Sequence, residues 1–152
     1  GFHILVVDTG GSHEDLTQDY ADIFQEMQSI AQELGKQVLR ELSLDDIINN
    51  IPSLRSKTGE RAILRAMHFF QDDQRVVEQA KALEENRFYD FLQLVRESGS
   101  SSWRLLQNCF STHNPKEQGL TLALAITENF INNTRMVICS ISQHIKIFRM
   151  FG

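Results

Sequence analysis

The residues of this chain whose types could do chemistry gather in a short polar loop near its start. Ile4–Val7 predicts a buried β-strand, and Asp8–His13, with the sequence Asp-Thr-Gly-Gly-Ser-His, follows it. Gly10 and Gly11 allow backbone turns that other residues resist. Because loops beside strand ends often contact ligands, His13 is a candidate substrate-binding residue. The strand before the loop and the helix expected after it would position these side chains.

One chemistry that such a loop could perform is that of an aspartic protease. These enzymes place an Asp-Thr-Gly triplet at the end of a strand, and two such carboxylates share a proton and activate one water. Asp8–Gly10 matches the triplet. However, those folds are almost entirely β, whereas the residues after the triplet predict helices. A polar strand-to-helix loop with no catalytic role is the simpler interpretation of the triplet.

Apolar residues at three-to-four spacing predict several amphipathic helices after this loop. The first runs over Leu16–Leu34 and should stop at Gly35. Ser43 should cap a short helix over Leu44–Asn49. The pattern continues over 58–83 and again over 88–95, and a polar break at Asn86 predicts a helical hairpin or a bent helix. This helical region ends with 103–106. The last predicted helix covers 120–130.

Two local signals near the end of the chain concern secondary structure. Asn114–Glu117, with the sequence Asn-Pro-Lys-Glu, has an Asn cap, Pro at the first helical position and Glu where it completes a capping box. This pattern predicts that the last helix opens there. Beyond it, Met136–Ile141 and Ile145–Phe151 are rich in Ile, Val and Phe and predict strands.

Composition limits the class of protein. The 152 residues are 41% hydrophobic and 23% charged, which describes one soluble domain with a core. The net charge of −5 and the lack of clustered Lys and Arg argue against a nucleic-acid partner. No apolar run is long enough to span a membrane. The two cysteines, Cys109 and Cys139, offer no zinc pattern or disulfide framework, so a cytoplasmic protein without a bound metal is expected.

Histidine in the middle of the chain offers a second candidate site. His68 lies on a predicted helix beside Arg65, and Asp72 is the only carboxylate at the spacing that a catalytic or metal role would need. One such pair is too little for that chemistry. We interpret the three residues as a structural polar face.

The chain resembles the galactokinase family, within the GHMP superfamily of small-molecule kinases, in a series of ordered segments. A match in so many ordered segments is far more specific than one motif. The resemblance spans about residues 2–130. The matching segments are 5–13, 15–17, Tyr20, 54–62, 64–70, 75–79, 91–99, 105–108 and 114–120.

This resemblance implies an ATP-dependent sugar kinase that transfers the γ-phosphoryl group to the anomeric hydroxyl of galactose or a related sugar. The family's sugar-orienting acidic motif, phosphate loop and catalytic Asp lie upstream of the matched region. The resemblance therefore implies that this chain is a C-terminal fragment without catalytic residues of its own. ATP and Mg would bind the parent enzyme, with no cofactor bound to this chain alone, which should be inactive because phosphoryl transfer needs all those parts together.

Tyr20 is the site residue that the resemblance carries over, because family members place a Tyr after this strand and loop where its hydroxyl can bond the sugar. On spacing alone, Tyr20 fits equally well as a core residue beside Ile23, Phe24 and Met27. Better-known galactokinases follow that Tyr with paired arginines, which this chain lacks. The identity of the sugar therefore stays open.

The end of the chain departs from the family. Galactokinases continue after the last helix into a glycine-rich turn, whereas residues 131–152 contain no glycine before Gly152 and no acidic residue. We therefore divide the chain into a galactokinase-like segment over 1–130 and a divergent tail over 131–152, whose composition is consistent with a shifted reading frame or a decayed gene.

The expected fold class is α+β: mainly helical, with amphipathic helices packed on a small antiparallel sheet. By resemblance this is an incomplete GHMP kinase C-terminal domain with a ferredoxin-like core. Its partners would be the sugar and the missing N-terminal domain, and the apolar surface left by that domain predicts self-association. The alternative is a stand-alone helical interaction or regulatory module derived from such a kinase.

Overall fold

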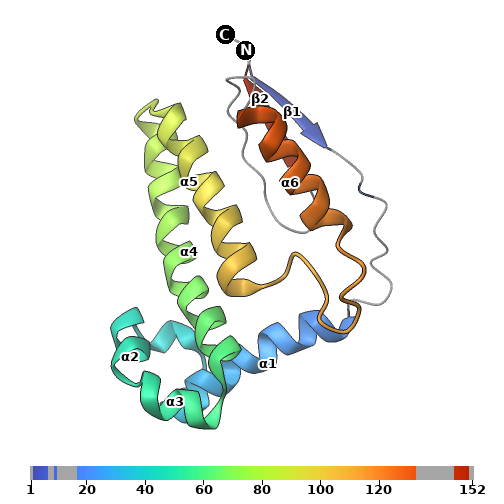
Figure 1. Ribbon diagram of the computed structural model, residues 1–152. Helices are drawn as coiled ribbons and strands as arrows, with labels where there is room; N and C mark the ends of the chain where they lie inside the picture. The colour runs from blue at the N-terminus through green and yellow to red at the C-terminus, as the bar shows by residue number, and fades with distance from the viewer. Residues whose placement is uncertain (1, 7–8, 10–16, 133–145, 151–152) are drawn as a thin grey trace.

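The computed structural model describes residues 2–6, 9, 17–132 and 146–150, and the side chains of 9 and 17–130 (Figure 1). Most of these residues are helical. The elements in chain order are β1 (Phe2–Val6), α1 (Thr17–Glu33), the 3₁₀ turn η1 (Leu39–Glu41), α2 (Leu44–Asn49), α3 (Ile51–Lys57), α4 (Glu60–Glu84), α5 (Phe88–Ser101), the π-helical turn η2 (Ser102–Leu106), α6 (Gly119–Asn132) and β2 (Lys146–Met150).

Helix α1 ends where the sequence predicts. Gly35 has φ +73°, a left-handed conformation that costs glycine little. The Gly35 N–H donates to the Gln32 carbonyl at 3.0 Å, and the Lys36 N–H donates to the Ala31 carbonyl at 2.8 Å. These two bonds form a Schellman motif, which satisfies carbonyls that the helix end would otherwise leave unpaired.

Helix α2 also begins as predicted, at a capping box. The Ser43 hydroxyl accepts from the Asp46 N–H at 3.2 Å, and the Asp46 carboxylate accepts from the Ser43 N–H at 2.8 Å. The helix covers Leu44–Asn49, the range expected from the sequence. Pro52 stands in the first turn of α3, where its missing N–H is not needed.

Helices α4 and α5 form the hairpin that dominates the molecule (Figure 1). The reversal between them occurs at Asn86, which has φ +58°. The Arg87 N–H donates to the Ala82 carbonyl at 2.7 Å, so α4 ends in the same motif as α1, with asparagine in the left-handed position. The sequence predicted a hairpin or a bent helix, and the structure is the hairpin.

The main apolar core lies where α1, η1, α2 and α3 meet the first half of α4 (Figure 1). Ile30, Ile47 and Leu54 are fully buried there, one from each of three different helices. A smaller apolar cluster around Leu92 and Val95 lies on α5. The main core therefore holds only the C-terminal half of α1, since Ile30 and Ala31 are the buried residues of that helix.

The segment after α5 departs from the prediction at one point. Asn114–Glu117 does not open a helix; the Glu117 N–H donates to the Asn114 carbonyl at 3.1 Å in a turn, and α6 begins at Gly119. A Cβ at Gly119 would lie 3.3 Å from the Thr9 carbonyl oxygen, which is closer than most Cβ contacts. The helix starts at a residue without a side chain, and this residue lies close to Thr9.

The predicted fold class was wrong. Helices were expected to pack on an antiparallel sheet with a ferredoxin-like core, but the main contacts of α1 to α5 are with other helices and helical turns. The two described strands pair only with each other, antiparallel, from Phe2 opposite Met150 to Val6 opposite Lys146. A two-stranded ladder is too narrow to cover a helical layer. The architecture is therefore mainly helical rather than α+β.

The division of the chain at residue 130 stays a prediction. Helix α6 continues to Asn132, and most of the tail, including the expected strand over 136–141, lies outside the described residues. Of the helices in the described part of the chain, none is both long enough and apolar enough to cross a membrane.

Candidate functional site

The structure places one of the two predicted site residues. Tyr20 lies in the first turns of α1 with 42% of its surface exposed, so it is not a core residue in this chain. Phe24, one turn later, is 67% exposed. His13 and Asp8 lie outside the described residues, as does most of their loop.

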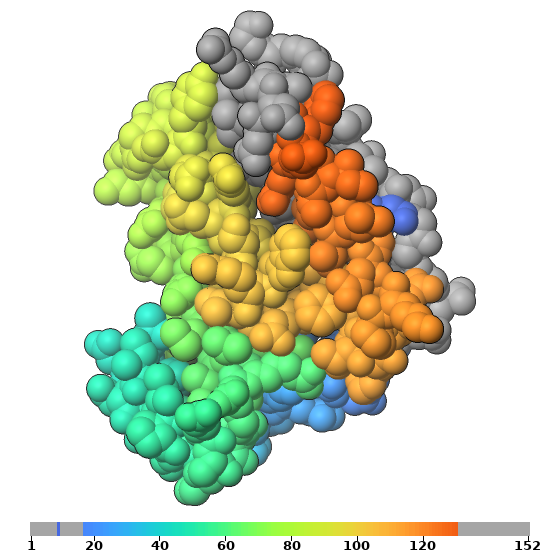
Figure 2. Space-filling view, viewed as in Figure 1, coloured from blue at the N-terminus to red at the C-terminus, as the bar shows by residue number. Residues whose placement is uncertain are grey.

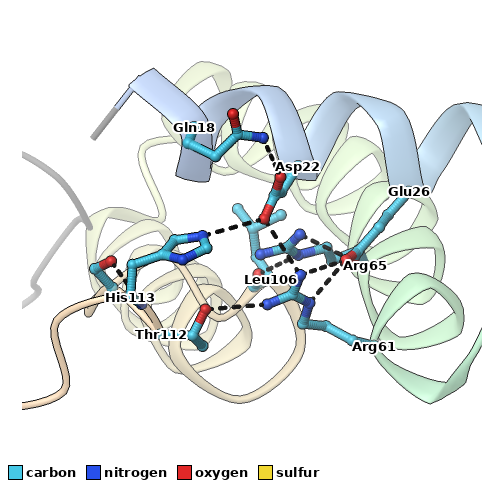
Figure 3. Close-up of polar contacts among 9 residues, drawn as sticks. Gln18, Asp22, Glu26, Arg61, Arg65, Leu106, Thr112 and His113 are labelled. Carbon is cyan, nitrogen blue, oxygen red and sulfur yellow. Dashed lines mark hydrogen bonds and ion pairs between the residues drawn. The ribbon is translucent and has the colours of Figure 1, made fainter. Parts of the chain in front are cut away.

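A network of ion pairs joins α1 to α4 (Figure 3). Asp22 and Glu26 are one turn apart on α1, and Arg61 and Arg65 are one turn apart on α4. The Glu26 Oε1 atom accepts from Arg61 Nε at 2.8 Å and Nη2 at 2.5 Å, while Oε2 accepts from Arg65 Nη1 at 2.9 Å. Glu26 is therefore shared between both arginines. We call these four residues the α1–α4 ion network.

The same network reaches the segment after α5. Arg65 Nε donates to the Leu106 carbonyl at 3.0 Å, at the end of η2. Arg61 Nη1 donates to the Thr112 hydroxyl at 3.4 Å, and His113 Nε2 lies 3.7 Å from Asp22 Oδ2. Figure 2 shows this segment, in orange, lying over α1, in blue, on the face viewed. Three parts of the chain therefore meet at the two arginines.

The surroundings shift the pKa values of Asp22, Arg61 and Arg65. The hydrogen bond from Gln18, together with Arg61, lowers the pKa of Asp22. The hydrogen bonds to Glu26 raise the pKa of Arg61. Burial lowers the pKa of Arg65, which is only 3% exposed, yet an arginine stays protonated at neutral pH. Carboxylates committed to arginines in this way are poor general bases, so the network is suited to holding elements together.

A third carboxylate lies beside this network. The Asp19 Oδ2 atom is buried and has no hydrogen-bond partner, which sets it apart from the other buried side-chain oxygens and nitrogens in the described part of the chain. The Asp19 charge also raises the pKa of Arg61. The first half of α1 thus presents three carboxylates to Arg61.

A serine, a histidine and an aspartate come together in the α4–α5 hairpin. The His68 Nδ1 atom lies 2.9 Å from the Ser101 hydroxyl, and His68 Nε2 lies 3.9 Å from Asp72 Oδ2. In a hydrolase this order of groups activates the serine. Here Ser101 is completely buried and Asp72 is bonded to Arg75 at 3.1 Å, so no substrate can reach the hydroxyl. The arrangement is structural.

The expected polar face of Arg65, His68 and Asp72 is thus divided in the structure. His68 and Asp72 face each other, but Arg65 belongs to the α1–α4 ion network. The sequence analysis missed the network. The sequence does place two acidic residues, Asp22 and Glu26, four positions apart on one predicted helix, and two arginines four positions apart on another. This spacing does not show which helices pack together.

The described residues include no cluster of metal ligands. Among them, no three side chains of His, Cys, Asp or Glu come close enough together to hold a metal ion. An open depression lies between α4 and α5, but Lys81, Arg87 and Asp90 on its wall already form ion pairs with neighbouring residues.

Comparison with known proteins finds galactokinases. The chain is 29% identical over 101 residues to a galactokinase of Actinobacillus pleuropneumoniae, 30% identical to one of Glaesserella parasuis and 29% identical to one of Thermotoga neapolitana. Each match covers 66% of this chain. No protein-family model matches the chain.

These relatives are much longer than this chain. The matched stretch covers 26% of the Actinobacillus protein and 27% of the Thermotoga protein. The chain therefore spans about a quarter of the length of the curated relatives it matches, and over that stretch it is similar to galactokinases.

Proposed function

We propose that this chain is the C-terminal part of a galactokinase-like kinase of the GHMP superfamily. One observation carries the proposal: the similarity to galactokinases over 101 residues. The parent enzyme would transfer the γ-phosphoryl group of ATP to the anomeric hydroxyl of galactose or a related sugar, in the cytoplasm. The alternative of a stand-alone helical module has no such observation in its favour.

The contribution of this chain to that reaction would be to the sugar site. Tyr20 is the residue we assign to it, with its hydroxyl bonding the sugar, and its exposed side chain is compatible with that role. His13, in the loop before α1, is the second candidate. ATP and Mg would be held by the rest of the parent enzyme, because the family's phosphate loop and catalytic Asp lie upstream of the matched region.

The isolated chain should therefore not phosphorylate sugar. Phosphoryl transfer depends on holding nucleotide, metal and acceptor in one geometry, and positioning supplies a large part of the rate. We also propose that the isolated chain self-associates, because Phe24 on α1 and Leu122 on α6 are each more than half exposed.

A chimeric enzyme tests the proposal. Residues 2–130 of this chain would replace the corresponding segment of the Thermotoga neapolitana galactokinase, and galactose-dependent release of ADP would be measured. We expect turnover by the chimera and none by the isolated chain. Tyr20→Phe should raise the KM for galactose about tenfold, the effect of losing one good hydrogen bond, and leave the KM for ATP unchanged.

The matched control is Tyr89→Phe, because Tyr89 is 70% exposed on α5 and has no assigned role. A chimera that melts cooperatively but shows no galactose-dependent ADP release would contradict the proposed function. Equal effects of the two tyrosine variants would remove Tyr20 from the sugar site while leaving the kinase assignment in place.

A further inference from the structure

Helix α1 is anchored unevenly along its length. Met27, Ile30 and Ala31 join the main core, and Leu34 packs against it just past the helix end. The ten residues before Met27 are all exposed or half-buried. Tyr20 lies seven residues before Met27, which is about 10 Å along a helix axis. Within the described part of the chain, the half of α1 that carries Tyr20 therefore lies beyond the apolar cluster that holds the rest of the helix.

Polar contacts hold this extended half in place. Asp22 and Glu26 are half-buried and bonded to Arg61, and Glu26 is also bonded to Arg65 (Figure 3). Arg65 is almost completely buried, and its Nε is fixed by the Leu106 carbonyl. Bonds from a fork-shaped guanidinium to a carboxylate constrain direction as well as distance. The two arginines therefore provide a rigid support on α4 for the half of α1 that the core does not reach.

The support also has the geometry to set a rotation. Asp22 and Glu26 lie one turn apart, so they define one face of α1, and Tyr20 lies outside that face. A rotation of α1 about its axis would break the bonds to Arg61, and the same rotation would move the Tyr20 hydroxyl. The Tyr20 side chain can follow such a rotation, because 42% of its surface is exposed.

We propose that Arg61 and Arg65 are positioning residues for the sugar site, acting through Asp22 and Glu26 to fix the place of Tyr20. This inference rests on the proposed function for its sugar half. Its structural half, that the α1–α4 ion network holds residues 17–26 in place, stands without it. Two experiments separate these halves.

Hydrogen exchange of the whole 152-residue chain tests the structural half. Arg61→Gln should make the amides of residues 21–26 exchange roughly tenfold faster, while the amides of residues 30–33 keep their rates because the core still holds them. Arg61→Lys, which keeps the charge and loses the fork, should fall between the variant and the wild type. The matched control is Arg55→Gln, which removes an ion pair whose partners are mostly exposed.

Each outcome of the hydrogen-exchange experiment either supports or overturns the structural half of the proposal. Faster exchange in Arg61→Gln that is confined to the first half of α1 would agree with the proposal that the network holds this half in place. Equal exchange in Arg61→Gln and Arg55→Gln overturns it, and so does a uniform increase along α1 to its end, which would mean that the arginine contributes only to overall stability.

Steady-state kinetics of the galactokinase chimera test the sugar half. Arg61→Gln should raise the KM for galactose about fivefold to tenfold with the KM for ATP unchanged, and its effect should not add to that of Tyr20→Phe, because both act through one hydroxyl. An unchanged sugar KM, or fully additive effects, overturns the positioning role. A wild-type chimera that turns over no sugar overturns the proposed function instead, and the hydrogen-exchange result then still decides whether the network holds α1.

Discussion

Replacing Glu26 with glutamine should lower the free energy of unfolding by about 2–3 kcal/mol. The carboxylate accepts three hydrogen bonds, at 2.5 and 2.8 Å from Arg61 and 2.9 Å from Arg65. An amide retains one acceptor oxygen and turns an N–H₂ group toward a guanidinium. Removing one partner of a fully buried pair costs about 3–5 kcal/mol. The side chains of Glu26 and Arg61 are 21% and 33% exposed, so solvent reduces that figure.

Urea denaturation followed by circular dichroism, at low protein concentration and neutral pH, measures this difference. The midpoint should fall while the slope of free energy against urea stays the same. Glu60→Gln is the matched control, because its pair with Arg55 is 66–68% exposed and should contribute no more than about 1 kcal/mol. Equal losses in the two variants would show that the α1–α4 ion network contributes no more than a surface ion pair does.

Three further predictions concern pH, thiol reactivity and association. Burial lowers the pKa of His68 below 6.5, so the unfolded state takes up a proton more readily than the folded state. The free energy of unfolding should therefore fall as pH drops below about 6.5, by up to about 1.4 kcal/mol per pH unit. His68→Gln should weaken this pH dependence in urea titrations, and an identical dependence in the variant would contradict the prediction. Burial raises the pKa of Cys109 to about 11, so in a Cys139→Ser chain Ellman's reagent should react with Cys109 only on unfolding, whereas fast labelling in native buffer would contradict this. Leu122 is 61% exposed, so Leu122→Lys should reduce self-association in analytical ultracentrifugation, and an unchanged distribution would show that α6 is not involved.

Local structure could be predicted from the sequence where neighbouring residues decide it. Gly35 ends α1 and Ser43 caps α2 because the bonds that form each cap join residues no more than five positions apart. The hairpin reversal at Asn86 belongs to the same group, since asparagine tolerates a left-handed conformation. Asn114–Glu117 was misjudged, although its residue types suit a helix start, because the chain instead turns there and lets Gly119 approach Thr9.

Tertiary arrangement could not be predicted in the same way. Apolar β-branched residues near both ends suggested a sheet that the helices would cover, but the helices bury their apolar faces against one another. The α1–α4 ion network depends on residues 35–39 positions apart, such as Glu26 with Arg61 and Asp22 with Arg61, whose meeting is set by the packing of two helices. The exposure of Tyr20 likewise follows from where the core lies along α1 rather than from its spacing.

Identification of the reaction product tests most directly whether this chain contributes a sugar site to a kinase. The galactokinase chimera would be incubated with ATP, Mg and galactose, and the phosphorus spectrum recorded by NMR. We expect a new phosphate monoester signal coupled to the anomeric proton of galactose, reduced in Tyr20→Phe and absent with the isolated chain. A folded chimera that forms no sugar phosphate, or one that places the phosphate on another hydroxyl, would contradict it.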